Sequence, residues 1–364
     1  MKDVSDIGYA YQPDVHFPAG DLLAEWLQRR GMSQAQFARR AALSTKHVNQ
    51  VLSGTAGLSA EVAVAFEKVT GIPTRFWMQL ESNHRAFEAQ RQEATALEGK
   101  LGILDQFPVK QLVARGAIEH QASPVDQLRE LLKFFGVANI TALEDVWLAP
   151  TALRTSKAYT PNHAALAAWL RIAELEAEHI DTEPFDAEHC AKALEEFRSL
   201  TRIPGTKWVE QLGQRCAAVG IALVIVKELP GSRINGATRW LSPSKAMIAL
   251  SLRHRRHDIL WFTFFHELGH LLRHGKRRLF IDAEGTGIDQ DLELDADRFA
   301  TRILIPPSDE GELPHLGTPA EVEAFATRIG IHPSLVVGRM QHERLIPYNR
   351  WNQLIPKYRF HDDH

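Results

Sequence analysis

The sequence has few of the features that mark secreted, membrane-spanning or strongly charged proteins. Of its 364 residues only two are cysteines, Cys190 and Cys216, so a disulfide framework is excluded. The most apolar stretch, residues 259–265, is far shorter than the roughly 20 residues that span a bilayer. The start MKDVSDIGYA also lacks the layout of a signal peptide. We therefore expect a cytoplasmic protein with no membrane partner.

Net charge is also small, because 42 Lys and Arg residues oppose 45 Asp and Glu residues, for a formal charge of −3. Bulk electrostatics therefore indicates neither a nucleic-acid nor a membrane partner, and any basic surface must be local. Sequence repeats of solenoid or propeller length are absent. Hydrophobic residues make up 45% of the chain, an ordinary globular share, so we expect a folded protein of two or three domains.

Glycine and proline positions divide the sequence into four parts, which together predict an α+β protein. Residues 1–98 read as an all-α domain of short helices, and residues 99–201 as an Ala-, Leu- and Glu-rich helical middle region. Residues 346–364 read as a C-terminal tail. Residues 202–345 contain three strand patterns, which predict a small sheet with helices around it: Ile221–Val226, Ile234–Trp240 and Ala246–Leu252.

The N-terminal domain carries the pattern of a helix-turn-helix between Ser33 and Gly54. Ser33 and Ser44 are each suited to cap a helix, and small residues lie where the two helices would meet at a tight turn. In the second helix the apolar side chains fall on one side and polar ones on the other. Polar side chains of these types can bind base edges and phosphates in the major groove.

Local charge agrees with DNA binding. No acidic residue lies between Glu25 and Glu61, whereas that interval contains Arg29, Arg30, Arg39, Arg40 and Lys46. The alternative is a helical domain whose polar residues are merely solvated. We expect binding to a double-stranded DNA operator, read by a homodimer as a two-fold site, through seven residues: Arg39, Arg40, Ser44, Thr45, Lys46, Asn49 and Gln50.

A second pattern, HELGH at residues 266–270, lies in a strongly apolar helical segment. His266 and His270 are one helical turn apart on one face, so both imidazoles can bind a single Zn²⁺. Glu267 lies beside them and can act as a general base on water. The alternative is a pair of core histidines that are hydrogen-bonded within the protein.

A catalytic zinc needs a third protein ligand. Glu293, 23 residues after His270, fills this role in a helical pattern that places it on one face with Asp297. Asp297 is expected to accept the free N–H of a ligating histidine. Asp295 is offset by two residues from Glu293 and points elsewhere. The alternative is that these acids are solvated helix charges.

These motifs resemble two known families. HELGHLL followed by ELDADRFATRILIP resembles the ImmA/IrrE zinc metallo-endopeptidases, whose zinc site is related in arrangement to that of thermolysin-like enzymes. GDLLAEWLQRRGMSQAQFARRAALSTKHVNQVLSG resembles the Cro/repressor-type helix-turn-helix in the form found in HigA-type antitoxins. The resemblance implies a zincin-like C-terminal domain with His266, His270 and Glu293 as ligands and Glu267 as the base.

We therefore predict a DNA-binding regulator that is also a zinc-dependent endopeptidase. The resemblance implies that it cleaves one protein, such as a repressor or antitoxin. Residues 246–252 are expected to offer an exposed strand edge to the substrate, and His274, Arg273 or the 231–236 loop to stabilise the oxyanion. The alternative is a non-catalytic antitoxin or transcriptional regulator whose metallopeptidase fold senses a ligand or binds a partner.

Overall fold

The structure, a computed structural model, describes residues 17–152, 162–275, 280–283 and 290–360. The first 16 residues of the predicted N-terminal domain and the last four of the predicted tail thus lie outside the described residues. The chain divides into two compact units, Met1–Leu101 and Gly102–His364. The predicted α+β class is confirmed. Within the described ranges, no helix combines the length and apolar character needed to cross a membrane.

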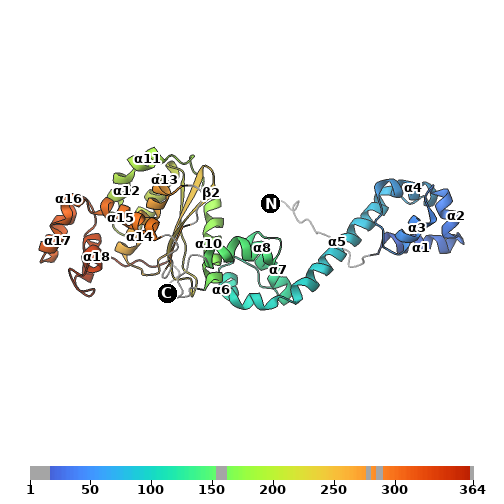
Figure 1. Cartoon of the computed structure of the whole chain (residues 1–364), viewed down its shortest axis with the longest axis horizontal. Coiled ribbons are helices and arrows are strands. Elements are labelled where there is room, and N and C mark those ends of the chain that lie inside the picture. The colour runs from blue at the N-terminus through green and yellow to red at the C-terminus, as the bar shows by residue number, and fades with distance from the viewer. Residues whose placement is uncertain (1–16, 153–161, 276–279, 284–289, 361–364) are drawn as a thin grey trace, which may run out of the picture. The chain divides into compact units, whose positions relative to one another are not determined.

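The described part of the N-terminal unit is a bundle of five helices around an aromatic core (Figure 1). Phe37, Phe66 and Trp77 are fully buried and pack edge to face, with ring centroids 5.1 and 5.3 Å apart. Burial of each such ring stabilises the unit by about 2–3 kcal/mol. The helices are α1 (Ala19–Arg30), α2 (Gln34–Arg40), α3 (Thr45–Leu52), α4 (Ala60–Thr70) and α5 (Thr74–Glu98).

Side-chain caps fix the ends of the helix-turn-helix. Ser33 caps α2 through a reciprocal capping box with Gln36, and Ser44 caps α3 by accepting the backbone N–H of His47. Both caps are those expected from the sequence. Between the two helices the chain passes through Ala42, whose φ of 54° lies in the left-handed region. Ala42 thus adopts a backbone conformation that is more favourable for glycine than for alanine.

The described residues of 102–201 are mainly helical, as expected for the middle region, and belong to the same unit as the sheet. The separation of a middle region from a domain at 202–345 therefore stays a prediction. The elements are η1 (Leu101–Gln106), α6 (Val109–Ala114), α7 (Pro124–Phe135), α8 (Ile140–Leu143), the π-helix η2 (Glu144–Leu148), α9 (Ala149–Ala152), α10 (His163–Glu178), α11 (Ala187–Lys192) and α12 (Leu194–Leu200).

The described residues form one four-stranded sheet in the order β1-β3-β2-β4. β1 is parallel to β3, and β2 is antiparallel to both β3 and β4. The expectation that residues 246–252 offer an exposed edge is wrong, because β3 pairs with a strand on each side. The strands are β1 (Ile221–Ile225), β2 (Ile234–Ser242), β3 (Lys245–Leu250) and β4 (Phe280–Ala283); the sequence analysis did not predict β4.

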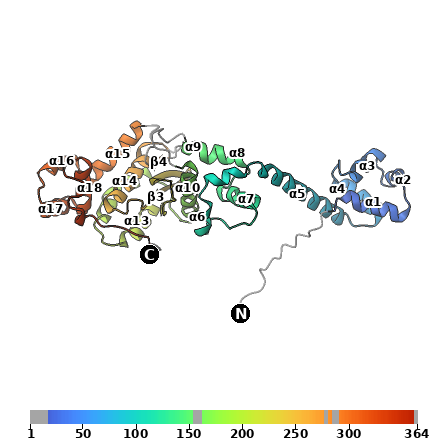
Figure 2. The ribbon, with the colours of Figure 1, turned by 90° about the horizontal axis from the view of Figure 1, so that it is seen from below.

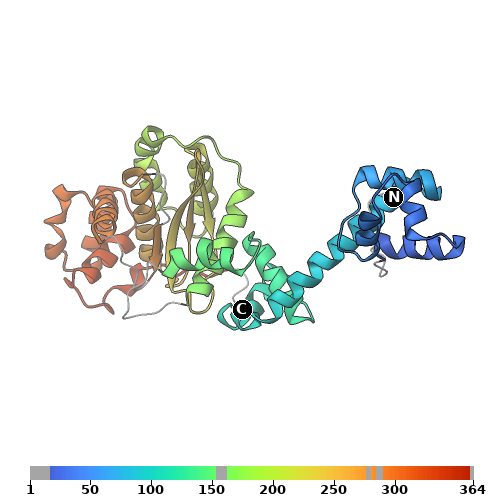
Figure 3. The same cartoon turned by 45° about the vertical axis from the view of Figure 1, so that its right-hand side comes forward.

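Helices cover both faces of this sheet, so β3 is buried almost throughout. α10 and α14 (His257–Arg273) both pack on it and lie on opposite faces (Figure 3). α15 (Gln290–Leu304) lies beside α14 (Figures 1 and 2). The remaining elements are α13 (Lys207–Ala218), α16 (Pro307–Glu310), η3 (Leu313–His315), α17 (Pro319–Ile329), α18 (Pro333–His342) and η4 (Asn352–Leu354).

His257 fixes the start of α14 in the core. Its Nε2–H donates to the Thr201 carbonyl oxygen at 3.0 Å, and its Nδ1 accepts from Ser334 Oγ at 2.7 Å. The ring also lies against the tilted ring of His332, with centroids 4.4 Å apart. Burial, reinforced by repulsion from His332, lowers the pKa of His257 to about 3. The folded protein therefore holds this ring neutral.

This depressed pKa predicts acid sensitivity of the C-terminal unit. In the unfolded chain His257 has its ordinary pKa of 6.5, so folding opposes its protonation. The stabilising contribution is complete above pH 6.5 and is lost as the pH falls toward 3. Unfolding in urea at a series of pH values should show this loss in the wild type and a shallower pH dependence in His257→Gln.

His315→Gln provides the control for acid unfolding, because His315 is an exposed histidine of the same unit. Its pH dependence should match that of the wild type. Equal slopes for His257→Gln and the wild type between pH 6.5 and 4 would contradict the assignment.

Candidate metal centre and helix-turn-helix surface

Two buried histidines on α14 form the base of the candidate metal centre. The apolar residues of α14 pack into the core and carry His266 and His270 into the protein, at 5% and 2% exposure. Because the two residues are one turn apart, their rings lie on one face of the helix. Their Nε2 atoms are 3.0 Å from each other.

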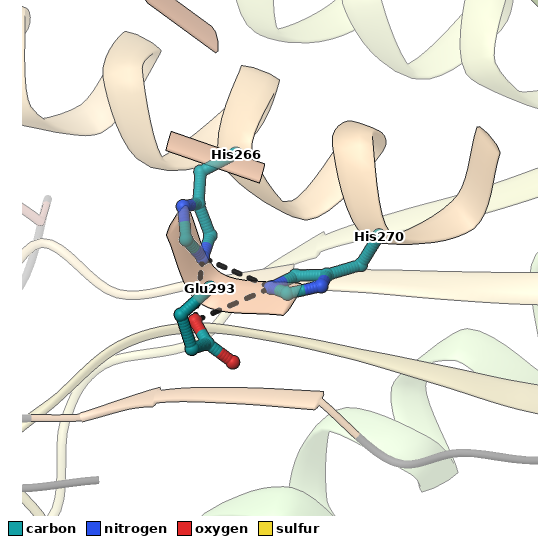
Figure 4. A group of neighbouring side chains, drawn as sticks. All are labelled: His266, His270 and Glu293. Atoms are coloured by element: carbon teal, nitrogen blue, oxygen red, sulfur yellow. Dashed lines mark hydrogen bonds and ion pairs between the residues drawn. The ribbon is translucent and has the colours of Figure 1, made fainter. Parts of the chain in front are cut away.

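Glu293, in the first turn of α15, completes the group. One of its carboxylate oxygens lies 3.1 Å from His266 Nε2 and 3.5 Å from His270 Nε2. The three side chains point toward one another from two helices, as Figure 4 shows, and a ligand atom of each lies within 4.8 Å of the others. The structure thus brings together the three residues that the sequence analysis named as ligands.

Small residues let the two helices approach closely enough for this contact. A methyl group added at Gly269, inside the HELGH motif, would lie 3.0 Å from the Phe299 ring and 3.3 Å from the Ala296 Cα. Gly269 and Ala296 therefore meet where α14 and α15 cross. A larger side chain at either position would hold Glu293 away from the imidazoles.

The electrostatics of the group favours the protonation states that bind a metal. Burial lowers the pKa of His270, which keeps its imidazole neutral at pH 7. Burial also acts to raise the pKa of the Glu293 carboxyl, but the contacts with His266 and His270 outweigh it and lower the pKa to about 2. A neutral imidazole beside an ionised carboxylate is the state that metal ions bind.

Asp297 lies behind the first histidine, where it was expected. Its Oδ1 is 2.9 Å from His266 Nδ1. His274, which follows α14, lies behind the second histidine, with 3.0 Å between the two Nδ1 atoms. Its Nε2 lies 3.1 Å from Asp295 Oδ2.

The expectation that His274 donates to an oxyanion does not fit these contacts, whereas that role for Arg273 or the 231–236 loop stays a prediction. Both ring nitrogens of His274 are engaged within the protein, and Arg273 Nε donates to Asp295. The contact of His274 with His270 was not predicted from the sequence. The helical spacing of 266, 270 and 274 is the signal that indicates it.

Glu267 is completely buried and its carboxylate faces β2. The Thr238 hydroxyl lies 2.6 Å from Glu267 Oε2 and donates to it. A methyl group added at Gly236 would lie 2.9 Å from Glu267 Oε1 and 2.6 Å from Thr263 Cγ2, so only glycine fits there. These roles of Gly236 and Thr238 were not predicted from the sequence. Their spacing of two in a strand, which places both on one face, is the available signal.

On the helix-turn-helix, α3 presents its polar side chains outward. Val48 and Val51 are buried. Six of the seven predicted DNA contacts are exposed, namely Arg39, Arg40, Ser44, Thr45, Lys46 and Asn49, and the seventh, Gln50, is half-buried. Asn49 Nδ2 donates to Gln34 Oε1 at 3.3 Å, a contact that the sequence analysis missed. Gln34 begins α2, so this pair links the two helices on the polar side.

Comparisons with protein families match both parts of the chain. Residues 23–77 match a helix-turn-helix family, and residues 224–340 match the family described as the IrrE N-terminal-like domain, an M78 peptidase family. The chain joins a helix-turn-helix domain to an IrrE N-terminal-like domain. The proposed ligands and Glu267 all lie within the IrrE N-terminal-like domain, which has a metallopeptidase-type fold.

Individual relatives match the N-terminal part. YddM, an uncharacterised HTH-type transcriptional regulator of Escherichia coli, is 28% identical over 76 residues, which are 21% of this chain and 81% of the relative. A HigA-family addiction module antidote protein from Coxiella burnetii is 27% identical, with a TM-score of 0.22, over 23% of this chain and 92% of that one. Pseudomonas aeruginosa antitoxin HigA, solved with the higBA promoter, is 26% identical, with a TM-score of 0.22, over 23% and 94%.

The close packing of Gly236 against Glu267 predicts a defect in Gly236→Ala. The added methyl group would displace Glu267 or Thr263, at a cost of about 1–3 kcal/mol in the free energy of unfolding. Chemical denaturation measures this loss.

Gly213→Ala in α13 is the matched control, because a methyl group there meets nothing within 4 Å. It should be neutral or more stable by up to about 1 kcal/mol. Equal stability of both variants would show that Glu267 does not pack on β2.

Proposed function

We propose that this protein is a DNA-binding regulator whose C-terminal domain is a zinc-dependent endopeptidase acting on a specific protein, such as a repressor or antitoxin. The observation that carries the peptidase half is the convergence of two imidazoles and one carboxylate on a common point. The HExxH motif and the M78 peptidase family support the same assignment.

The donor set fits zinc. Two ligands bound to one tetrahedral zinc at roughly 2.0–2.1 Å lie about 3.3 Å apart. The distances among the two Nε2 atoms and the Glu293 oxygen are 3.0, 3.1 and 3.5 Å. His266, His270 and Glu293 would hold the ion, which leaves a fourth position for water or substrate.

The hydrogen bonds around the group are also compatible with a bound metal ion. A metal-binding His266 would be neutral, with its Nδ1–H donating to the Asp297 carboxylate and a lone pair at Nε2. The Glu293 carboxylate lies 3.1 Å from the same Nε2 atom. A metal ion bound there would accept electron pairs from His266, His270 and Glu293 at once.

When bound, zinc would supply Lewis-acid polarisation of the scissile carbonyl and acidify water. The protein supplies the proton transfers. Glu267 would take a proton from the attacking water and return it to the leaving amine. The Thr238 hydroxyl holds Glu267 Oε2 at 2.6 Å, which fixes the orientation of this carboxylate.

For the helix-turn-helix half, we propose that α3 enters the major groove of an operator bound by a homodimer. Ser44, Thr45, Lys46, Asn49 and Gln50 would face the bases, while Arg39 and Arg40 at the end of α2 would meet phosphates. The buried side of α3 supports this orientation, because Val48 and Val51 leave only the polar side available.

A Glu267→Gln variant tests the peptidase half. Loss of the general base should lower cleavage by about 10²–10⁴-fold, while the unchanged ligands retain zinc. Cells that express the wild type or Glu267→Gln are compared by mass spectrometry of protein N-termini, and the zinc content of each purified protein is measured. New N-termini should appear only with the wild type.

Two results would contradict the peptidase. A zinc content well below one ion per chain in the purified wild type would contradict the proposed metal site. Identical N-termini in both strains, despite bound zinc, would instead favour the non-catalytic regulator.

Substitutions in α3 test the DNA half. Operators are first selected from a random duplex library with the full-length wild type. Asn49→Ala should weaken binding to the selected DNA by about 1–3 kcal/mol and relax its sequence preference. Lys46→Ala should lower the salt slope of binding by about 1.

Electrophoretic shift assays at several salt concentrations provide both readouts. Arg91→Ala on the exposed side of α5 is the control and should bind like the wild type. Unchanged binding by the Lys46 and Asn49 variants would remove α3 as the recognition helix.

A further inference from the structure

Each of the two candidate histidine ligands is backed by a carboxylate on the side away from the metal centre. One contact is direct, and the other passes through a second imidazole. Asp297 lies directly on His266 Nδ1. Behind His270 the contact is a second imidazole, that of His274, and the carboxylate of Asp295 lies beyond it. Glu293, Asp295 and Asp297 are spaced by two residues on α15, and they contact different members of a row of three histidines: His266 and His270 on α14, and His274 just after it.

The hydrogen bonds in this row have only one direction compatible with metal binding. Arg273 Nε donates to Asp295 Oδ2 at 2.5 Å, and in this ion pair the carboxylate only accepts. In the neutral form of His274 the proton therefore lies on Nε2, and Nδ1 presents a lone pair. The hydrogen between the two Nδ1 atoms then belongs to His270.

This direction determines what His270 presents to the metal centre. A neutral imidazole with its proton on Nδ1 has a lone pair on Nε2. His270 Nε2 is the atom that faces His266 and Glu293. If His274 were turned or replaced by an apolar residue, the proton of His270 could move to Nε2, which would block metal binding.

We propose that His274 and Asp295 are positioning residues that hold His270 in the tautomer required for zinc binding. The proposal rests on the zinc site proposed above. It extends that site to a relay from Asp295 through His274 to His270. The side chain of His274 is only 5% exposed, so water competes little for its Nδ1. Outer partners of metal-bound histidines typically change metal affinity by about 10–100-fold.

The test compares two substitutions at His274 in the full-length protein. His274→Asn places a carbonyl oxygen where Nδ1 was, so it can still accept from His270. His274→Leu removes the acceptor at a similar size. The zinc dissociation constant, measured by competition with a chromophoric chelator, should rise at least tenfold for His274→Leu and stay within about threefold for His274→Asn.

Further variants separate the relay from general effects on folding or charge. Asp295→Asn keeps an acceptor for His274 but removes the charge, so its affinity should lie between those of the two His274 variants. His342→Leu, which removes an exposed histidine of α18, is the control and should bind zinc as the wild type does. Thermal unfolding of each variant identifies any that fail to fold. If His274→Leu fails to fold, the zinc affinity of Asp295→Asn replaces it as the test of the relay.

A second readout needs no zinc. Long-range ¹H–¹⁵N spectra of the metal-free protein, labelled at histidine, report which ring nitrogen of His270 carries the proton. The proton should lie on Nδ1 in the wild type and in His274→Asn, and should be shared with Nε2 in His274→Leu.

The two readouts distinguish the possible failures. A wild type that binds no zinc would overturn the proposed peptidase. The spectra of the metal-free protein would still show whether His270 carries its proton on Nδ1, as the relay requires. Either of two results would overturn the relay. One is equal zinc affinity of the wild type and a folded His274→Leu variant. The other is a proton on Nε2 of His270 in the wild type.

Discussion

The close crossing of α14 and α15 is the constraint on which the candidate site depends. One helix supplies the imidazoles and the other the carboxylates, so the distance between the helices decides whether they meet. That distance is set by Gly269 on α14 and Ala296 on α15. A methyl group added at Gly269 would lie 3.0 Å from the Phe299 ring. The HELGH motif therefore encodes packing as well as ligands.

The sequence predicted the parts of the site that depend on helical spacing. The pairs His266 with His270 and Glu293 with Asp297 each follow from a separation of four residues, and the structure places all four side chains together. It did not predict contacts between elements, such as Thr238 on Glu267 or His274 in the relay. Those contacts depend on which strand or helix lies opposite, and local spacing carries no information about that.

The same division applies to the fold. Helix caps at Ser33 and Ser44 are local, and both were predicted correctly. The position of β3 inside the sheet depends on how residues far apart in the chain pair, so its expected exposed edge was wrong. The left-handed conformation of Ala42 was also not predicted, because no glycine marks that position.

The site's charges suggest why these residues are arranged around a cation. Near neutral pH the Glu293 carboxylate is ionised and His270 is neutral. When His270 carries its proton on Nδ1, as proposed above, the lone pair of its Nε2 faces that carboxylate in a partly buried place, which raises the free energy of the folded state. A zinc ion would remove this cost, and Asp297 and Asp295 would balance part of its charge from behind the histidines. Metal binding and the close crossing of α14 with α15 would therefore stabilise each other.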